Sequence, residues 1–134
     1  MILESIVNKS PIVKGWSGDQ KYCAVTADGT KYLLRVSSID RLERKRREYE
    51  KMSEVSQLGI PMCLPVEFGI CDEGAYSIQS WIDGVDAEDA MMAMCPEQQY
   101  SYGLDAGRIL ASIHTICGGA HSMSQKGRIW VRKG

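Results

Sequence analysis

Residues 11–58 read PIVKGWSGDQKYCAVTADGTKYLLRVSSIDRLERKRREYEKMSEVSQL, and the rest of the chain is organised around this stretch. Within it, side chains alternate in type over residues 31–37, which is the period-2 pattern of a half-buried strand. This pattern predicts Leu34 on one face of the strand and Leu33 with Arg35 on the other. A guanidinium beside apolar side chains needs an anion, which can be a carboxylate of the protein or a phosphate of a ligand.

The segment before this strand predicts two more antiparallel strands. A first strand is expected to begin at Pro11 and to run into Gly15-Trp-Ser-Gly-Asp19, where two glycines stand three residues apart. Such a turn exposes backbone N–H groups, as phosphate-covering loops do, although most Gly-x-x-Gly turns are simple hairpins. The return strand is expected over residues 20–27, and Asp28-Gly29 is a strong hairpin signal before the next strand.

A charged helix is predicted over residues 41–57, with Ser38 or Asp40 as its cap and Glu48 at the edge of its apolar stripe. The other face is basic, with Arg41, Arg44, Lys45, Arg46, Arg47 and Lys51. Glutamates are interspersed there, which favours a solvated face with ion pairs over a nucleic-acid surface. Glu48 is the candidate partner of Arg35, either in a structural ion pair or beside a bound phosphate.

The second half of the chain predicts two further strands and then helices. The strands are expected over residues 64–70 and 75–82, and Asp83-Gly84 follows them. A short helix is expected to open at Asp86, and a long one with a broad apolar stripe covers residues 96–116. The polar, glycine-rich remainder has no clear period and is expected to be poorly ordered.

Composition limits the class of protein. With 134 residues, 44% hydrophobic and 25% charged, the chain suits one globular domain or a lobe with an appendage. A net charge of -1 argues against a general nucleic-acid or membrane-surface binder, and no apolar stretch is long enough for a membrane span. Five scattered cysteines indicate free thiols in a reducing cytoplasm. Cys117 and His121 have a zinc-like spacing, but no second ligand pair accompanies them.

The order and spacing of several segments resemble the aminoglycoside phosphotransferase family of small-molecule kinases. These segments are residues 14–19, 31–36, 47–51, 58–61, 80–84 and 106–116. The resemblance implies an α+β fold. A protein-kinase-like N-lobe with a five-stranded antiparallel sheet and one packed helix is expected, followed by a linker and the helices of a truncated C-lobe. The expected division is an N-lobe over residues 1–82, a linker with a short helix over 83–95, a C-lobe helix over 96–117 and a tail over 118–134.

The resemblance also implies an ATP site. Arg35 would hold the nucleotide phosphates, with Glu48 orienting it. The backbone of Ser80 and Ile82 would pair with the adenine edge, while Leu33 covers the base and Gln79 lies at the back of the pocket. The nucleotide-positioning loop would be Gly15, Trp16, Ser17, Gly18 and Asp19.

The sequence departs from the family in its later part. Phosphoryl transfer in this family needs a His-Gly-Asp-x-x-x-x-Asn loop and a further metal-binding aspartate. In this sequence Asn8 is the only asparagine, and Asp105 is the last aspartate. We therefore expect the ATP-binding portion of a kinase of a small-molecule hydroxyl, with antibiotics among the acceptors. It is expected to be inactive alone, with magnesium binding only where the missing C-lobe is present. His114 is read as a packing residue.

The resemblance also implies the binding partners of the protein. A nucleotide and, in the full-length family, a small-molecule acceptor are expected, without nucleic acid or membrane. The apolar stripe of the helix over residues 96–116 is expected to lead to self-association, to docking onto the N-lobe or to swapping between chains, because apolar surface left in water is unfavourable. The alternative is a non-catalytic binding or regulatory module that keeps the kinase N-lobe fold.

Overall fold

A computed structural model describes residues 1–15 and 18–116 of the chain. These residues divide into two compact units, one made of 1–56 with 61–82, and the other of 57–60 with the described residues from 83 onward. The first unit contains α1 (Ile2–Ser5), β1 (Ile6–Ile12), β2 (Gln20–Thr26), β3 (Lys31–Ser37), a 3-10 turn (Ile39–Arg41), α2 (Leu42–Ser56), β4 (Pro65–Cys71) and β5 (Gly74–Ser80).

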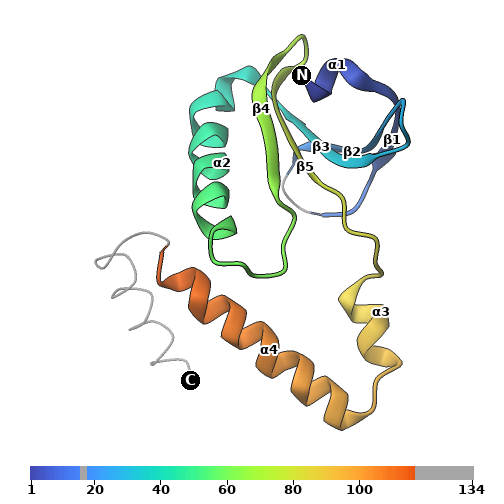
Figure 1. Ribbon diagram of the computed structural model, residues 1–134, viewed down its shortest axis with the longest axis vertical. Helices are drawn as coiled ribbons and strands as arrows, with labels where there is room; N and C mark the ends of the chain where they lie inside the picture. The colour runs from blue at the N-terminus through green and yellow to red at the C-terminus, as the bar shows by residue number, and fades with distance from the viewer. Residues whose placement is uncertain (16–17, 117–134) are drawn as a thin grey trace. The chain divides into compact units, whose positions relative to one another are not determined.

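The five strands form one antiparallel sheet in the order β1-β2-β3-β5-β4, as Figure 1 shows. Strand β3 lies at the centre, between β2 and β5, and β1 and β4 form the two edges. Helix α2 follows β3 and contacts β4 and β5. This is the α+β, kinase-like N-lobe arrangement that the sequence predicted.

One face of the sheet forms the hydrophobic core. Its buried members are Ala24, Leu34, Val36, Tyr76 and Ile78, and residues of the N-terminal segment pack against them. Leu34 is 2% exposed and Ile78 is fully buried, as expected for alternate residues of central strands whose side chains point to the same side. The predicted alternation over residues 31–37 is therefore confirmed.

Helix α2 packs against the sheet through the predicted apolar stripe. Tyr49 on α2 and Phe68 on β4 have ring centroids 5.4 Å apart, and Val55 in the last turn is buried. The helix is preceded by the 3-10 turn, whose N-cap Ser38 makes no side-chain capping bond. Gly59, with φ of 71°, follows the helix and lets the chain turn toward β4.

The beginning of β1 was predicted wrongly. The strand starts at Ile6 rather than Pro11, since residues 6–12 pair with β2 from Ile6 opposite Thr26 to Ile12 opposite Lys21. Most side chains of β1 are exposed on an edge strand, so apolar alternation could not reveal it. The other strand predictions agree with the structure to within two residues, and the Asp28-Gly29 hairpin is confirmed by a 2.9 Å bond from the Gly29 N–H to the Thr26 carbonyl.

Glu67 on β4 fastens the N-terminal segment to the sheet. Its carboxylate accepts hydrogen bonds from the N–H of Ile2 at 2.9 Å, the N–H of Leu3 at 3.2 Å and the hydroxyl of Tyr76 at 2.8 Å. Burial opposes ionisation of Glu67, but these three donors outweigh it and hold the pKa of Glu67 below its usual range. Burial and the Glu67 carboxylate raise the pKa of Tyr76 to about 12.

Glu67→Gln is expected to lower the free energy of unfolding at pH 7 by about 1–2 kcal/mol, because the glutamine amide is uncharged and offers one acceptor oxygen where the carboxylate offers two. The folded-state pKa of Glu67 lies below its unfolded value of 4.5, so its stabilisation is complete above that value and is lost as the pH falls through the folded-state pKa. Urea unfolding between pH 7 and pH 3 measures both effects. The variant should lose stability less steeply on acidification; Glu50→Gln, at an exposed position of α2, should match the parent.

The second unit contains α3 (Ala87–Met92) and α4 (Pro96–His114), close to the predicted helices. Gln98 closes the first turn of α4 by accepting a 3.1 Å bond from the Cys95 N–H, and Gln99 donates a 2.9 Å bond to the Met91 carbonyl. No helix among the described residues is long and apolar enough to cross a membrane. The predicted tail lies outside the described residues.

Candidate functional site

The face of the sheet opposite the core carries three of the residues predicted for a nucleotide site, Leu33, Arg35 and Gln79. In the strand register Cys23 on β2 lies opposite Leu33 on β3, which lies opposite Gln79 on β5. The next row joins Lys21, Arg35 and Ser77 in the same way. Because side chains alternate along a strand, these two rows project from one face and form a polar and apolar surface across the three central strands.

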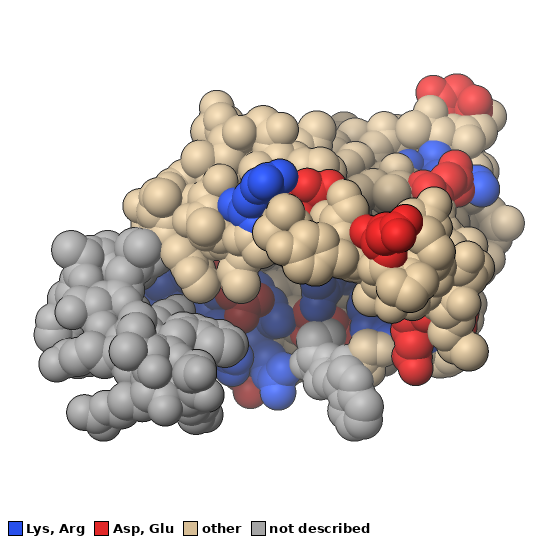
Figure 2. All heavy atoms as spheres, turned by 90° about the horizontal axis from the view of Figure 1, so that it is seen from below, with Lys and Arg blue, Asp and Glu red and all other residues tan. Residues whose placement is uncertain are grey.

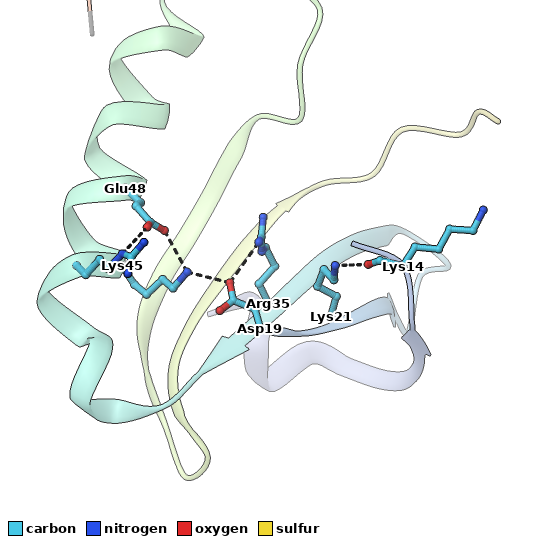
Figure 3. A network of polar contacts seen from close by, with 7 residues as sticks. Lys14, Asp19, Lys21, Arg35, Lys45 and Glu48 are labelled. Carbon is cyan, nitrogen blue, oxygen red and sulfur yellow. Dashed lines mark hydrogen bonds and ion pairs between the residues drawn. The ribbon is translucent and has the colours of Figure 1, made fainter. Parts of the chain in front are cut away.

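Arg35 forms an ion pair with Asp19, the last residue before β2. The distance from Arg35 Nη2 to Asp19 Oδ2 is 3.2 Å, and the side chains are 29% and 2% exposed. Lys45 on α2 contacts the same oxygen at 3.0 Å and is 15% exposed. Figure 3 shows the Asp19 carboxylate between these two cations, one from the sheet and one from the helix.

The structure corrects the predicted partner of Arg35. Sequence reasoning paired Arg35 with Glu48, but among the described ion pairs Arg35 meets the carboxylate of Asp19, and Glu48 meets Arg44 and Lys45. Glu48 contacts Lys45 at 3.1 Å and Arg44 at 3.2 Å, and its side chain is 48% exposed. Glu48 is thus connected to Arg35 through Lys45 and Asp19 (Figure 3). The reason is geometric, because Asp19 enters from the start of the neighbouring strand, whose residue Lys21 lies directly opposite Arg35.

Lys45 is the site residue that sequence reasoning missed. It was assigned to the solvated basic face of the helix, whereas its side chain is largely buried between Asp19 and Glu48. A signal was present in the spacing, since Lys45 precedes Glu48 by three residues, Tyr49 by four and Met52 by seven. These intervals place all four side chains on one helical stripe, the one that faces the sheet.

A small cavity of about 40 Å³ lies between α2 and the sheet, behind this ion-pair network. It is lined by Asp19, Arg35, Ser37, Lys45, Glu48, Tyr49, Met52, Phe68, Ala75, Tyr76, Ser77 and Gln79. This volume suits one or two water molecules. Ligand pockets typically need about 300 Å³ or more, so a nucleotide cannot fit inside the cavity. A nucleotide would have to lie on the surface formed by the two rows.

Two glycines shape the segment before Asp19. Gly15 and Gly18 have φ values of 104° and 77°, a region that favours glycine because it has no Cβ. The predicted loop residues Trp16 and Ser17 lie outside the described residues. The Lys21 ammonium donates to the Lys14 carbonyl, which links the two ends of the segment (Figure 3).

The predicted hinge, Ser80 to Ile82, begins at the last residue of β5. The Ser80 N–H donates to the Leu64 carbonyl at 2.9 Å, and the Ser80 hydroxyl accepts from the Leu64 N–H at 2.7 Å. These two bonds hold the end of β5 against the residue before β4. Gln79 is 4% exposed, whereas Ile82 is 56% exposed beyond the strand.

Charges of both signs are distributed over the protein. Figure 2 shows one face on which Lys and Arg side chains are interspersed with Asp and Glu side chains. Within residues 1–15 and 18–116, no group of three or more His, Cys, Asp or Glu side chains could hold a metal ion. Cys117 and His121, whose spacing resembles a zinc site, lie outside this part of the chain.

Comparison with known proteins assigns this arrangement to a family. The sequence model of the phosphotransferase enzyme family matches residues 10–131, which include β2 to β5 and both later helices. The chain belongs to the phosphotransferase enzyme family. No curated protein matches the sequence.

Membership gives the site its chemical context. Proteins of the phosphotransferase enzyme family are kinase-like, and in protein kinases the lysine of the nucleotide site lies on the third strand of the sheet. In this phosphotransferase-family chain, Arg35 occupies β3 and projects from the face opposite the core.

Proposed function

We propose that the chain binds ATP on the sheet face formed by the rows of Leu33 and Arg35. The observation that carries this proposal is the Arg35 guanidinium, held partly exposed on that face by the carboxylate of Asp19. A planar guanidinium suits phosphate oxygens because it offers paired donors in a fixed geometry. The apolar side chain of Leu33 would cover the base, and Gln79, which lies opposite Leu33 on β5, would lie at the back of the pocket.

The hinge would supply the remaining contacts to adenine. Ser80 is held by its two bonds to Leu64, so its backbone is fixed where β5 ends. The Ser80 carbonyl and the Ile82 N–H would read the base edge, since backbone groups can pair with a flat heterocycle without side chains. Gly15 and Gly18 would let the backbone before β2 approach the phosphates from the other side.

The reaction that this site would serve is phosphorylation of a small-molecule hydroxyl, with aminoglycoside antibiotics as the acceptor class to test first. We propose that the 134 residues by themselves bind nucleotide without transferring phosphate. The support is chemical: phosphoryl transfer uses an aspartate that positions the acceptor and an asparagine that binds magnesium, and Asn8 is the only asparagine of the sequence.

The test is a titration of the protein with ATP and with adenosine, followed by tryptophan fluorescence. Arg35→Ala should weaken ATP binding about tenfold or more, because a charged hydrogen bond is worth about 1.5–3 kcal/mol. Adenosine has no phosphate, so its binding should be unchanged, which also shows that the variant is folded. The matched control Arg108→Ala removes an arginine that is 71% exposed and ion-paired with Asp105.

Three results would contradict parts of the proposal. Equal ATP affinity of the parent and Arg35→Ala would remove Arg35 from the phosphate site. No response of the parent to ATP or adenosine would favour the non-catalytic binding module. Release of ADP above background in the presence of an aminoglycoside, in the same samples, would show that the chain transfers phosphate after all.

A further inference from the structure

The starting observation is that two cations meet on one oxygen. Arg35 Nη2 and Lys45 Nζ lie 3.2 and 3.0 Å from Asp19 Oδ2, and they come from β3 and α2. The position between them is therefore built to hold an anionic oxygen, with charge-assisted hydrogen bonds from two elements. Asp19 places its own carboxylate there, with a side chain that is 2% exposed.

The balance of charge around this position favours a stronger anion. In the ion pairs found here among the described residues, Arg35, Lys45 and Arg44 supply three cations, and Asp19 and Glu48 supply two carboxylates. A polyphosphate carries several negative charges and can accept from Arg35 and Lys45 together. A carboxylate carries only one charge, so replacing it with polyphosphate strengthens the attraction to both cations.

The location of Asp19 makes such a replacement feasible. Its backbone precedes Gln20, the first residue of β2 and the first to pair with β3 in that strand. The strand register that fixes Arg35 therefore does not include Asp19. Arg35 and Lys45 are set in a central strand and in a helix of 15 residues, so they can stay in place while the carboxylate moves.

We infer that Lys45 is a second phosphate-binding cation and that Asp19 is a resident anion which nucleotide phosphate displaces from between Lys45 and Arg35. This inference rests on the proposed nucleotide site and adds two residues with opposite effects. Lys45 raises the affinity for polyphosphate, and Asp19 lowers it by competing for the same two donors.

The direction in which Asp19→Asn changes the polyphosphate affinity distinguishes a competing anion from a structural one. If Asp19 only orients the two cations, Asp19→Asn weakens polyphosphate binding. If Asp19 competes, Asp19→Asn strengthens it. We expect inorganic tripolyphosphate to bind Asp19→Asn about tenfold more tightly than the parent and Lys45→Met about tenfold more weakly, as for other close charge pairs. Adenosine binding should not change in either variant.

Matched controls remove the same charges elsewhere. Asp105→Asn removes a carboxylate that is 68% exposed and paired with Arg108, and Lys51→Met removes a lysine that is 52% exposed on the same helix as Lys45. Both should bind tripolyphosphate within about twofold of the parent, because exposed pairs contribute little. Titration calorimetry gives the affinities, and thermal melting reports whether each variant is folded.

A measurement on the parent protein keeps the inference testable if Asp19→Asn does not fold. The carboxyl carbon signal of Asp19, assigned by NMR, should shift as tripolyphosphate binds, while that of Asp105 should not. A stationary Asp19 signal at saturation, or weaker binding by Asp19→Asn, would overturn displacement. Unchanged binding by Lys45→Met would overturn the role of Lys45. Absence of tripolyphosphate and ATP binding in both the parent and Asp19→Asn would overturn the nucleotide site as well.

Discussion

Replacing Ile78 with alanine is expected to lower the free energy of unfolding by about 3–4 kcal/mol, a large part of the stability of a small domain. Ile78 is fully buried at the centre of the core face, and it lies opposite Leu34 on β3. The loss combines the transfer of three methyl or methylene groups with a cavity that close-packed neighbours cannot fill. Urea unfolding followed by circular dichroism measures the change.

The neighbouring edge strand offers a matched control for this substitution. Ile70 on β4 is the same residue type in the same sheet, but it is 60% exposed. Ile70→Ala should therefore cost less than about 1 kcal/mol, since little apolar surface is removed from a buried environment. A similar loss in both variants would mean that the core does not lie on the face where the structure places it.

Replacing Gly74 with alanine is expected to lower the free energy of unfolding by about 4 kcal/mol, through backbone strain and steric overlap together. Gly74 has a φ of 138°, a conformation that residues with a Cβ rarely adopt. A Cβ there would overlap the carbonyl oxygen of Ser37 and lie 3.0 Å from the nitrogen of Ile39. The overlap would push β5 away from the end of β3.

Gly29→Ala is the control that separates the cost of backbone strain from the cost of steric overlap at Gly74. It also occupies a hairpin turn with a positive φ, 86°, but nothing lies within 4 Å of the Cβ that alanine would add. Gly29→Ala should therefore cost about 1–2 kcal/mol, the strain alone. If thermal and urea unfolding show equal losses at the two glycines, the close approach of Gly74 to Ser37 is wrong.

Ile78→Ala and Gly74→Ala are expected to differ in their effect on the candidate site. Ser37 lies opposite Ala75 in the register and lines the cavity behind Arg35, so displacement by Gly74→Ala would reach the ion-pair network. Ile78 projects toward the core face, whereas Arg35 belongs to the opposite one. Its truncation should therefore lower stability while the remaining folded molecules keep the Asp19 and Arg35 pair.

Much of the fold was predictable because its signals are local. The period-2 alternation over residues 31–37, the Asp28-Gly29 turn and the stripe that includes Tyr49 and Val55 each depend on residues close together in the chain. The start of β1 was not predictable in this way. That strand is recognised by its pairing with β2, and its exposed side chains carry no alternation.

The candidate site was likewise predictable only where its signals are local in the sequence. The strand pattern was enough to put Arg35 on the face opposite the core and to require an anion beside it, because a guanidinium cannot be left among apolar groups without one. The carboxylate that pairs with Arg35 is set by how the start of β2 approaches β3. The position of α2 decides that Lys45 turns inward and shares this carboxylate. Such approaches join residues 16 and 26 positions apart in the sequence, and they are set by packing of the whole sheet and helix, which no short pattern of residues encodes.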